Sequence, residues 1–168
     1  MRAAILLGTD TGDAAKSFAD ARRLIEERAG RIAAVSEVLT SRAWGFESER
    51  MFSNQALCVD TALSPEELLD VLQGVERECG RDRDAEAREK ARTGQPYASR
   101  VLDADIIFCD GLTVDTPRLK IPHPLVAQRE FALRPLAQII PAQRHPLTGR
   151  TVAEMLAGIE NDSDMNDE

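Results

Sequence analysis

Six periodic segments in the first two thirds of the chain follow one another in an order that few folds allow. Apolar runs and β-branched residues predict short strands, and apolar residues at three- and four-residue spacing predict helices. The order is strand, helix, strand, strand, helix, strand, over residues 3–8, 13–30, 32–39, 54–61, 64–79 and 102–109. This order is typical of the split βαβ arrangement, in which one antiparallel sheet carries two helices.

Both predicted helices have clear end signals. Asp13 is placed to cap the first helix and Gly30 to end it. Ser64, followed by Pro65 and Glu67, forms a capping box with proline at the first helical position, and predicts the start of the second helix. We therefore predict an α+β fold, a ferredoxin-like βαββαβ sandwich with added C-terminal elements. Its two helices would cover one face of the sheet and leave the other face open for a ligand.

Two long connections interrupt this pattern. Residues 40–53 form a polar connection that contains the single tryptophan and two of the five phenylalanines. Such a loop either contacts a ligand or packs on its own apolar side chains. Residues 80–100 have mixed charge and no sustained apolar period, which suits either a functional lid or a solvated, helix-like linker.

The C-terminal third is divided by prolines. Residues 114–141 read as a series of short pieces, after which Thr151 and Glu154 form a capping box for a last helix. The end of the chain is acidic and poor in apolar residues. We expect one domain over residues 1–157 and an acidic, disordered tail over 158–168.

The charge balance excludes some classes of partner. A net charge of −8 over 168 residues argues against broad nucleic-acid binding, which needs a basic surface. Lysine and arginine outnumber acids between residues 77 and 100, so an anionic ligand is expected there. No apolar run approaches the roughly 20 residues that cross a bilayer, and we expect a cytoplasmic protein with no membrane or nucleic-acid partner.

The three cysteines, Cys58, Cys79 and Cys109, are odd in number, widely spaced and set in apolar patterns. This spacing does not suit a metal site, and it favours buried free thiols.

The last predicted strand contains two acids. Because side chains alternate along a strand, Asp103, Asp105 and Ile107 would point one way, and Leu102, Ala104, Ile106 and Phe108 would form the core face. The two acids would be about 7 Å apart along the strand. Two carboxylates this close to each other on an apolar surface repel and need a cation. This is either an arginine pair or one or two divalent ions held together with substrate phosphates.

Downstream, His123 lies between two prolines that stiffen its backbone, and Arg129 and Phe131 follow. With Arg100 and the two acids, these residues resemble the pattern of the bacterial 6-hydroxymethyl-7,8-dihydropterin pyrophosphokinases of folate biosynthesis. The stretches "RVLDADIIF", "IPHPLVAQREFALRPLAQIIP" and "HPLTGRTVAEML" carry the resemblance, which extends over about residues 3 to 156.

The resemblance implies an enzyme that moves pyrophosphate from ATP to the hydroxymethyl group of a reduced pterin, with ATP as co-substrate, two Mg²⁺ ions and no obligate protein partner. It implies that Asp103 and Asp105 bind the metal and act in catalysis with Arg81, Arg83 and Arg100. It implies ATP contacts from Gln73, Glu76, Tyr97, Arg100, Ile106, Arg118, His123 and Arg129. It implies pterin contacts from Ser41, Arg42, Trp44, Phe52, Asn54 and Phe131.

Two stretches depart from the family pattern. The first strand ends in Gly8-Thr9-Asp10, where the family has asparagine in place of Asp10. The segment before Arg100 has Tyr97 in the place of the family's usual tryptophan, and the connection is longer than usual. These departures keep a second hypothesis open, a non-catalytic ferredoxin-like module that binds nucleotide or pterin. A purely structural protein would leave the combination of acids, His123 and Arg129 without a reason.

Overall fold

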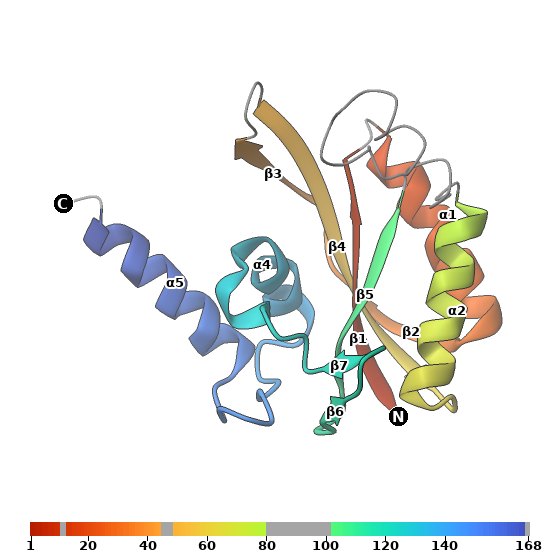
Figure 1. Ribbon diagram of the computed structural model, residues 1–168. Helices are drawn as coiled ribbons and strands as arrows, with labels where there is room; N and C mark the ends of the chain where they lie inside the picture. Colours follow the sequence, from red (N-terminus) through yellow and green to blue (C-terminus); the bar gives the residue numbers. More distant parts are fainter. Residues whose placement is uncertain (11–12, 45–48, 80–101, 167–168) are drawn as a thin grey trace.

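The computed structural model describes residues 1–10, 13–44, 49–79 and 102–166, with a sheet between two layers of helices (Figure 1). The strands are β1 (Arg2–Thr9), β2 (Gly30–Val35), β3 (Leu39–Trp44), β4 (Glu49–Thr61), β5 (Asp103–Cys109), β6 (Val114–Asp115) and β7 (Lys120–Ile121). The helices are α1 (Ala14–Arg28), α2 (Pro65–Glu78), the short 3₁₀ helix η1 (Val126–Gln128), α4 (Glu130–Ile139) and α5 (Val152–Asn166).

The main sheet is antiparallel. Its strands lie in the order β2-β4-β1-β5, and β3 pairs with the part of β4 that β2 does not reach. β1 is central, because it pairs with β4 on one side and β5 on the other. β6 and β7 form a separate small ladder. The mixed α/β architecture predicted from the sequence is confirmed.

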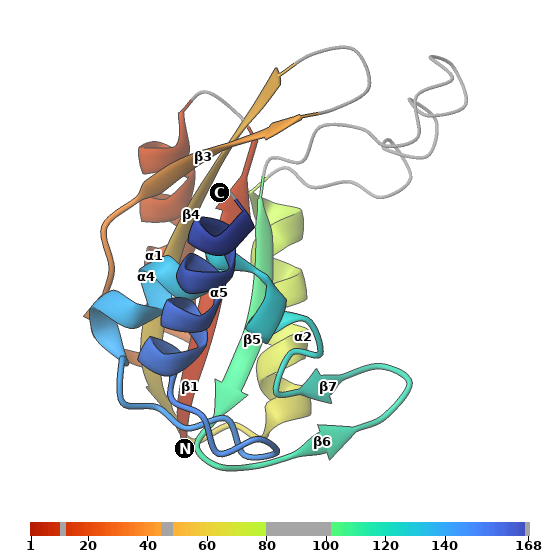
Figure 2. The same ribbon diagram turned by 90° about the vertical axis from the view of Figure 1, so that its left-hand side faces the viewer.

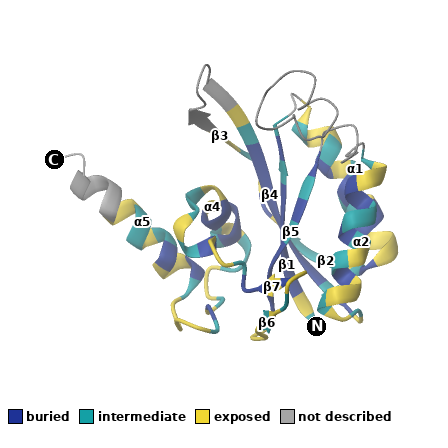
Figure 3. Ribbon diagram, in the orientation of Figure 1, coloured by how far each residue is buried: buried dark blue, intermediate teal, exposed yellow. Residues whose placement is uncertain are grey.

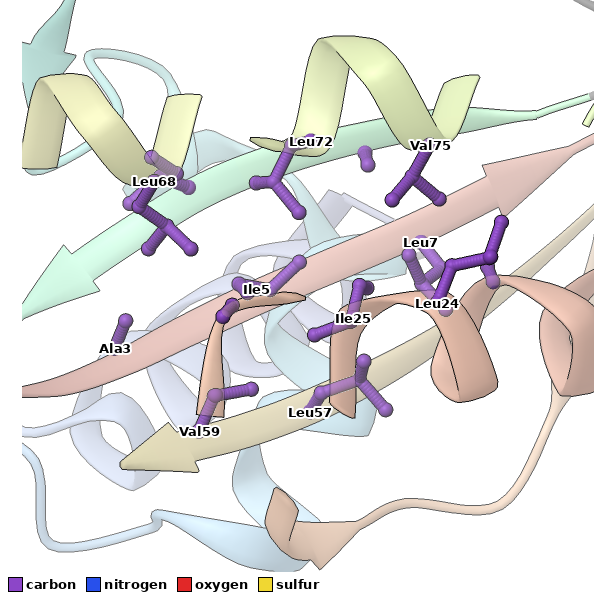
Figure 4. Close-up of a cluster of buried hydrophobic side chains, with 14 of the residues drawn as sticks. Ala3, Ile5, Leu7, Leu24, Ile25, Leu57, Val59, Leu68, Leu72 and Val75 are labelled. Carbon is purple, nitrogen blue, oxygen red and sulfur yellow. The ribbon is translucent and has the colours of Figure 1, made fainter. Parts of the chain in front are cut away.

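Helices α1 and α2 cover one face of this sheet and enclose the first core (Figure 4). Side chains from β1 meet helix residues such as Ile25 and Leu72, which are fully buried. The predicted caps are present. Asp13 accepts from the Lys16 backbone, and Ser64 and Glu67 form the reciprocal capping box at the start of α2.

We expected the opposite face of the sheet to be open, but part of its length is covered. Helices α4 and α5 pack against it and form a second core, and Figure 2 shows them in front of the sheet. Helix α4 was not predicted because the prolines divide this part of the sequence into short pieces. Pro135 removes one hydrogen-bond donor inside α4, yet the helix persists because Leu133 and Leu136 are fully buried.

Strand β5 changes faces at Ile107, so the strict alternation predicted from the sequence is wrong beyond that residue. Ile5 pairs with Ile106 but Ala4 pairs with Phe108, so Ile107 is an extra residue, a β-bulge. Ile106 therefore packs in the first core and Phe108 in the second.

The connection expected over residues 40–53 is also corrected, because most of it is a hairpin of β3 and β4. Ser41 pairs with Phe52, and Trp44 with Glu49. The mixed polar composition of these strands hid the alternation by which a strand is recognised.

The last helix begins after Thr151, whose hydroxyl accepts from the Glu154 backbone at 3.1 Å. It continues to Asn166, beyond residue 157 where we expected the domain to end, and Ile159 packs against the second core. Figure 3 shows the buried residues gathered along the sheet and the inner sides of the helices.

All three cysteines are free thiols, as predicted. Cys58 and Cys109 are buried, Cys79 is half-buried, and burial raises the pKa of Cys109 to about 11. Within the described part of the chain, no helix has the length and apolar character to span a membrane.

Candidate functional site

Three residues on neighbouring strands form one row across the sheet, near the end of β1 and the start of β5. Gly8 of β1 pairs with Asn54 of β4 on one side and with Asp103 of β5 on the other. Paired residues of antiparallel strands direct their side chains to the same face. Because neighbouring strands lie about 4.8 Å apart, Asn54 and Asp103 are roughly 10 Å apart across Gly8.

The two acids lie on the face that also carries the second core. Asp105 pairs with Leu6, which belongs to that core, whereas Ala104 and Ile106 pack in the first core. Asp103 and Asp105 are both half-buried. The predicted direction of the two carboxylates, away from α1 and α2, is confirmed.

Gly8 leaves the space that the row needs. A Cβ at this position would lie 3.0 Å from Nδ2 of Asn54 and 4.0 Å from Cβ of Asp103. The Asn54 side chain is held in place, since the residue is 7% exposed and its Nδ2 donates to the Leu7 carbonyl at 3.3 Å. The amide and the carboxylate therefore flank a stretch of bare backbone.

His123 is joined to the acid-bearing strand through its backbone. Its N–H donates to the Ile107 carbonyl at 3.0 Å, at the bulge, and the Leu125 N–H donates to its ring Nδ1 at 3.2 Å. Burial lowers the pKa of His123, and the nearby Arg129 charge lowers it further, while Asp103 opposes both. Because Nδ1 accepts the Leu125 N–H, the neutral ring carries its proton on Nε2.

Arg129 and Phe131 lie at the start of α4. The Arg129 guanidinium carbon is 5.5 Å from the centre of the Phe131 ring, a cation–π contact. Phe131 is 42% exposed, which is unusual for a phenylalanine next to a core. The charges of both Asp103 and Arg129 affect the pKa of His123, so these three residues lie close together.

The hairpin supplies the residues expected to bind the pterin. Phe52, Asn54 and Ala56 alternate along β4, and Ala56 belongs to the second core, so all three face the α4 layer. Phe52 is half-buried, and Ser41 opposite it is exposed. Arg42 and Trp44 belong to strand β3, and the structure describes only their backbone.

A separate group forms on α2. Nη2 of Arg118 donates to Gln73 Oε1 at 3.3 Å and pairs with the Asp70 carboxylate. Glu76 is 6% exposed. Gln73 and Arg118, both predicted to contact the nucleotide, are therefore in contact with each other.

Ile106 differs from the other predicted nucleotide contacts. It is 4% exposed and packs in the first core, so its side chain lies on the opposite face from the acids. Arg81, Arg83, Tyr97 and Arg100 lie outside the described residues.

The donor chemistry suits magnesium better than a transition metal. Among the residues that the structure describes, no group of three or more His, Cys, Asp and Glu side chains could hold a metal ion. Two carboxylates on one strand are a donor set that fits Mg²⁺ when substrate phosphates and water complete its coordination.

Two residues were missed by sequence reasoning. Gly8 was read only as the residue where the first strand passes into a turn, and its proposed role depends on neighbours in the distant strands β4 and β5. Asp70 lies three residues before Gln73, and this helical spacing was the available signal.

Comparison with known proteins agrees with the resemblance found in the sequence. The family model "7,8-dihydro-6-hydroxymethylpterin-pyrophosphokinase (HPPK)" matches residues 4–141. Two curated proteins similar to the chain are both named 2-amino-4-hydroxy-6-hydroxymethyldihydropteridine pyrophosphokinase. The one from Pseudomonas aeruginosa is 39% identical over 127 residues, covering 76% of this chain and 72% of that protein. The one from Porphyromonas gingivalis is 32% identical over 136 residues, covering 80% and 88%.

A solved structure with the same fold is Plasmodium falciparum HPPK-DHPS with pterin and p-hydroxybenzoate. It has a TM-score of 0.72 and 14% sequence identity, and the match covers 98% of this chain. This chain spans 44% of that longer one.

Proposed function

The chain belongs to the 7,8-dihydro-6-hydroxymethylpterin-pyrophosphokinase family, and from that premise we propose how its own residues carry out the reaction. The protein is an ATP-dependent diphosphokinase of folate biosynthesis. It transfers pyrophosphate from ATP to the hydroxymethyl group of hydroxymethyldihydropterin. The finer assignments, which concern the metal, the individual contacts and the fold class, are the proposal.

Asp103 and Asp105 are proposed to hold two Mg²⁺ ions together with the ATP phosphates. The two half-buried carboxylates on one face support this, because such a pair is stabilised by a cation. When bound, the metal would neutralise phosphate charge and make the β-phosphorus easier to attack.

His123, Arg129 and Arg118 are proposed to orient the nucleotide. A neutral His123 with its proton on Nε2 can donate to a phosphate or ribose oxygen, and the Leu125 N–H fixes that tautomer. The guanidinium groups suit phosphate oxygens because their planar forks match them. Contacts from the remaining predicted residues stay predictions: Gln73, Glu76, Arg81, Arg83, Tyr97, Arg100 and Ile106.

Asn54, Phe52 and Phe131 are proposed to bind the pterin. Asn54 would read the polar edge of the ring, and the two aromatic side chains would stack on its faces. Their positions on β4 and on α4, two elements in contact with each other, support this arrangement. Ser41, Arg42 and Trp44 would complete the pocket from β3.

The observation that carries the proposal is the row Asn54, Gly8, Asp103. In this row the Asn54 amide, which would bind the polar edge of the pterin, lies about 10 Å from Asp103, the first acid proposed to bind metal. Gly8 places no side chain between them. A pterin held at Asn54 can then extend its hydroxymethyl group over Gly8 toward a phosphate chain held at Asp103.

The test is AMP release from ATP, Mg²⁺ and 6-hydroxymethyl-7,8-dihydropterin by the purified chain. Asp103→Asn and Asp105→Asn should each lower kcat by about a thousandfold, since several kcal/mol of charge stabilisation would be lost. Asp110→Asn is the matched control, because Asp110 immediately follows the same strand, is exposed, and has a φ of 48° that asparagine tolerates. Activity retained in both test variants would refute the metal assignment.

A non-catalytic binding module is not favoured by the family match. Tight ATP binding measured by calorimetry, without AMP release, would revive it. We assign the sheet to the ferredoxin-like class, supported by the order β2-β4-β1-β5 and by two helices on one face. A cytoplasmic location stays a prediction.

A further inference from the structure

A chain of hydrogen bonds passes around the edge of the sheet from α1 to α4. Nη1 of Arg22 donates to Gln55 Oε1 at 2.6 Å, and Nε2 of Gln55 donates to the Ser36 carbonyl at 2.9 Å. The next residue, Glu37, donates its backbone N–H to Gln138 Oε1 at 2.9 Å. Because α1 and α4 cover opposite faces, this chain connects both helical layers at the turn between β2 and β3.

The inner part of the chain is built into the protein. Ser36 and Gln55 are each 5% exposed. The Ser36 hydroxyl donates to the Glu37 carbonyl at 2.8 Å and accepts from the Ala56 N–H at 2.8 Å. The turn is therefore fastened to β4, and buried polar groups satisfied in this way are costly to disturb.

The outer part is a two-way contact between exposed residues. Glu37 donates its N–H to Gln138, and Gln138 donates its Nε2 back to Glu37 Oε2 at 3.5 Å. We call this pair the Glu37–Gln138 bracket. It joins residues 101 positions apart in the chain.

We propose that the Glu37–Gln138 bracket positions α4 against the β3–β4 hairpin and so sets the width of the pterin pocket. Gln138 follows Phe131 by seven residues, nearly two helical turns, so both lie on the same side of α4. Glu37 precedes β3 by two residues, and Leu39 at the start of β3 pairs with Asn54.

The two walls of the pocket are thus tied at one end. Phe131 belongs to the α4 wall, and Phe52 and Asn54 belong to the hairpin wall. A flat ring that stacks between two walls is sensitive to changes of a few tenths of an ångström in their separation, because dispersion falls steeply with distance. This inference rests on the proposal that the pterin binds between α4 and the hairpin.

The test is a swap of the two side chains. In Gln138→Glu, a carboxylate oxygen can still accept from the Glu37 N–H, but the donor is lost and two carboxylates face each other. In the double variant Glu37→Gln with Gln138→Glu, position 37 supplies the amide donor and position 138 the acceptor, so the bracket is restored with its direction reversed.

The readout is AMP release, with KM measured separately for the pterin and for ATP. Gln138→Glu should raise the pterin KM about threefold to tenfold, the loss expected from one hydrogen-bonded pair. The ATP KM should rise less, because Arg118 and His123, which are also proposed to orient the nucleotide, lie outside α4. The double variant should return the pterin KM to within about twofold of the unmodified protein. Glu160→Gln is the matched control, because it removes an ion pair that joins α4 through Arg134 to α5 instead of to the hairpin.

Three outcomes would overturn the inference. One is an unchanged pterin KM in Gln138→Glu. A second is an equal rise in both KM values, which would indicate general loosening. The third is failure of the double variant to recover. Phe131→Ala separates this from the parent proposal, since an unchanged pterin KM in that variant would mean that the pterin binds elsewhere.

Discussion

Replacing Gly8 by alanine should damage pterin binding without weakening the fold. Gly8 lies in β1 between Asn54 and Asp103. An added Cβ would lie 3.0 Å from the Asn54 amide nitrogen, whereas ordinary contacts begin at about 3.4 Å. The amide must therefore shift by a few tenths of an ångström, away from the Leu7 carbonyl that it contacts at 3.3 Å.

The size of the effect follows from two opposing terms. Loss of one buried hydrogen bond costs about 1 kcal/mol, and alanine in a strand gains roughly 0.5–1 kcal/mol over glycine. The free energy of unfolding should then change by less than about 1 kcal/mol. A displaced Asn54 can no longer pair well with the pterin edge, and about 1.4 kcal/mol of lost binding is a tenfold rise in KM.

The assay is AMP release with KM for each substrate, together with urea unfolding. The pterin KM should rise about tenfold while the ATP KM changes less than twofold. Gly74→Ala is the matched control, because Gly74 lies within helix α2 and its Cβ would meet only arginine side-chain atoms, at 3.7 Å or more. A pterin KM equal to that of the unmodified protein would refute the role given to Gly8, and a collapse of stability would show that the clash is with the backbone.

Other perturbations give distinct outcomes. Gly30→Ala should unfold the protein or cost more than about 3 kcal/mol in urea unfolding, because Gly30 has a φ of 151° and its Cβ would lie 2.1 Å from the Asp60 carbonyl oxygen; a loss below about 1 kcal/mol would contradict this. Burial lowers the pKa of His145, so its contribution to stability is present above about pH 6.5 and is lost as the pH falls through its folded pKa. The free energy of unfolding should therefore fall more steeply with acid than in His145→Asn, which keeps an acceptor for the loop backbone; parallel curves would exclude His145 as the cause. Arg118→Lys keeps the charge but loses the fork, so the ATP KM should rise about tenfold with the pterin KM unchanged, and equal rises would argue against a nucleotide role.

Local signals predicted the parts of the fold that depend on local contacts. The start of α2 could be placed because Ser64 and Glu67 bond to each other's backbone within one turn. The direction of Asp103 and Asp105 followed from alternation over three residues. The residues of the candidate site were predicted from the family resemblance of a few short stretches, such as "RVLDADIIF".

What could not be predicted depends on distant partners. The bulge at Ile107 is defined by the register of β5 against Ala4 and Ile5 of β1, and the sequence of β5 alone does not predict it. Helix α4 was hidden because Pro135 reads as a breaker, whereas burial of Leu133 and Leu136 outweighs one missing hydrogen bond. Gly8 matters only because Asn54 and Asp103 are its neighbours across the sheet.

The bulge in β5 has a consequence for how such chains can vary in length. The Ile107 carbonyl accepts from the His123 N–H, and Asp105 lies two residues earlier in the same strand. Deleting Ile106, the residue between them, would put Ile107 opposite Ile5, turn its side chain toward the first core, and move the attachment point of the His123 segment by about 3.3 Å. Insertions and deletions should therefore accumulate in the connections between elements, while β5 keeps a constant number of residues.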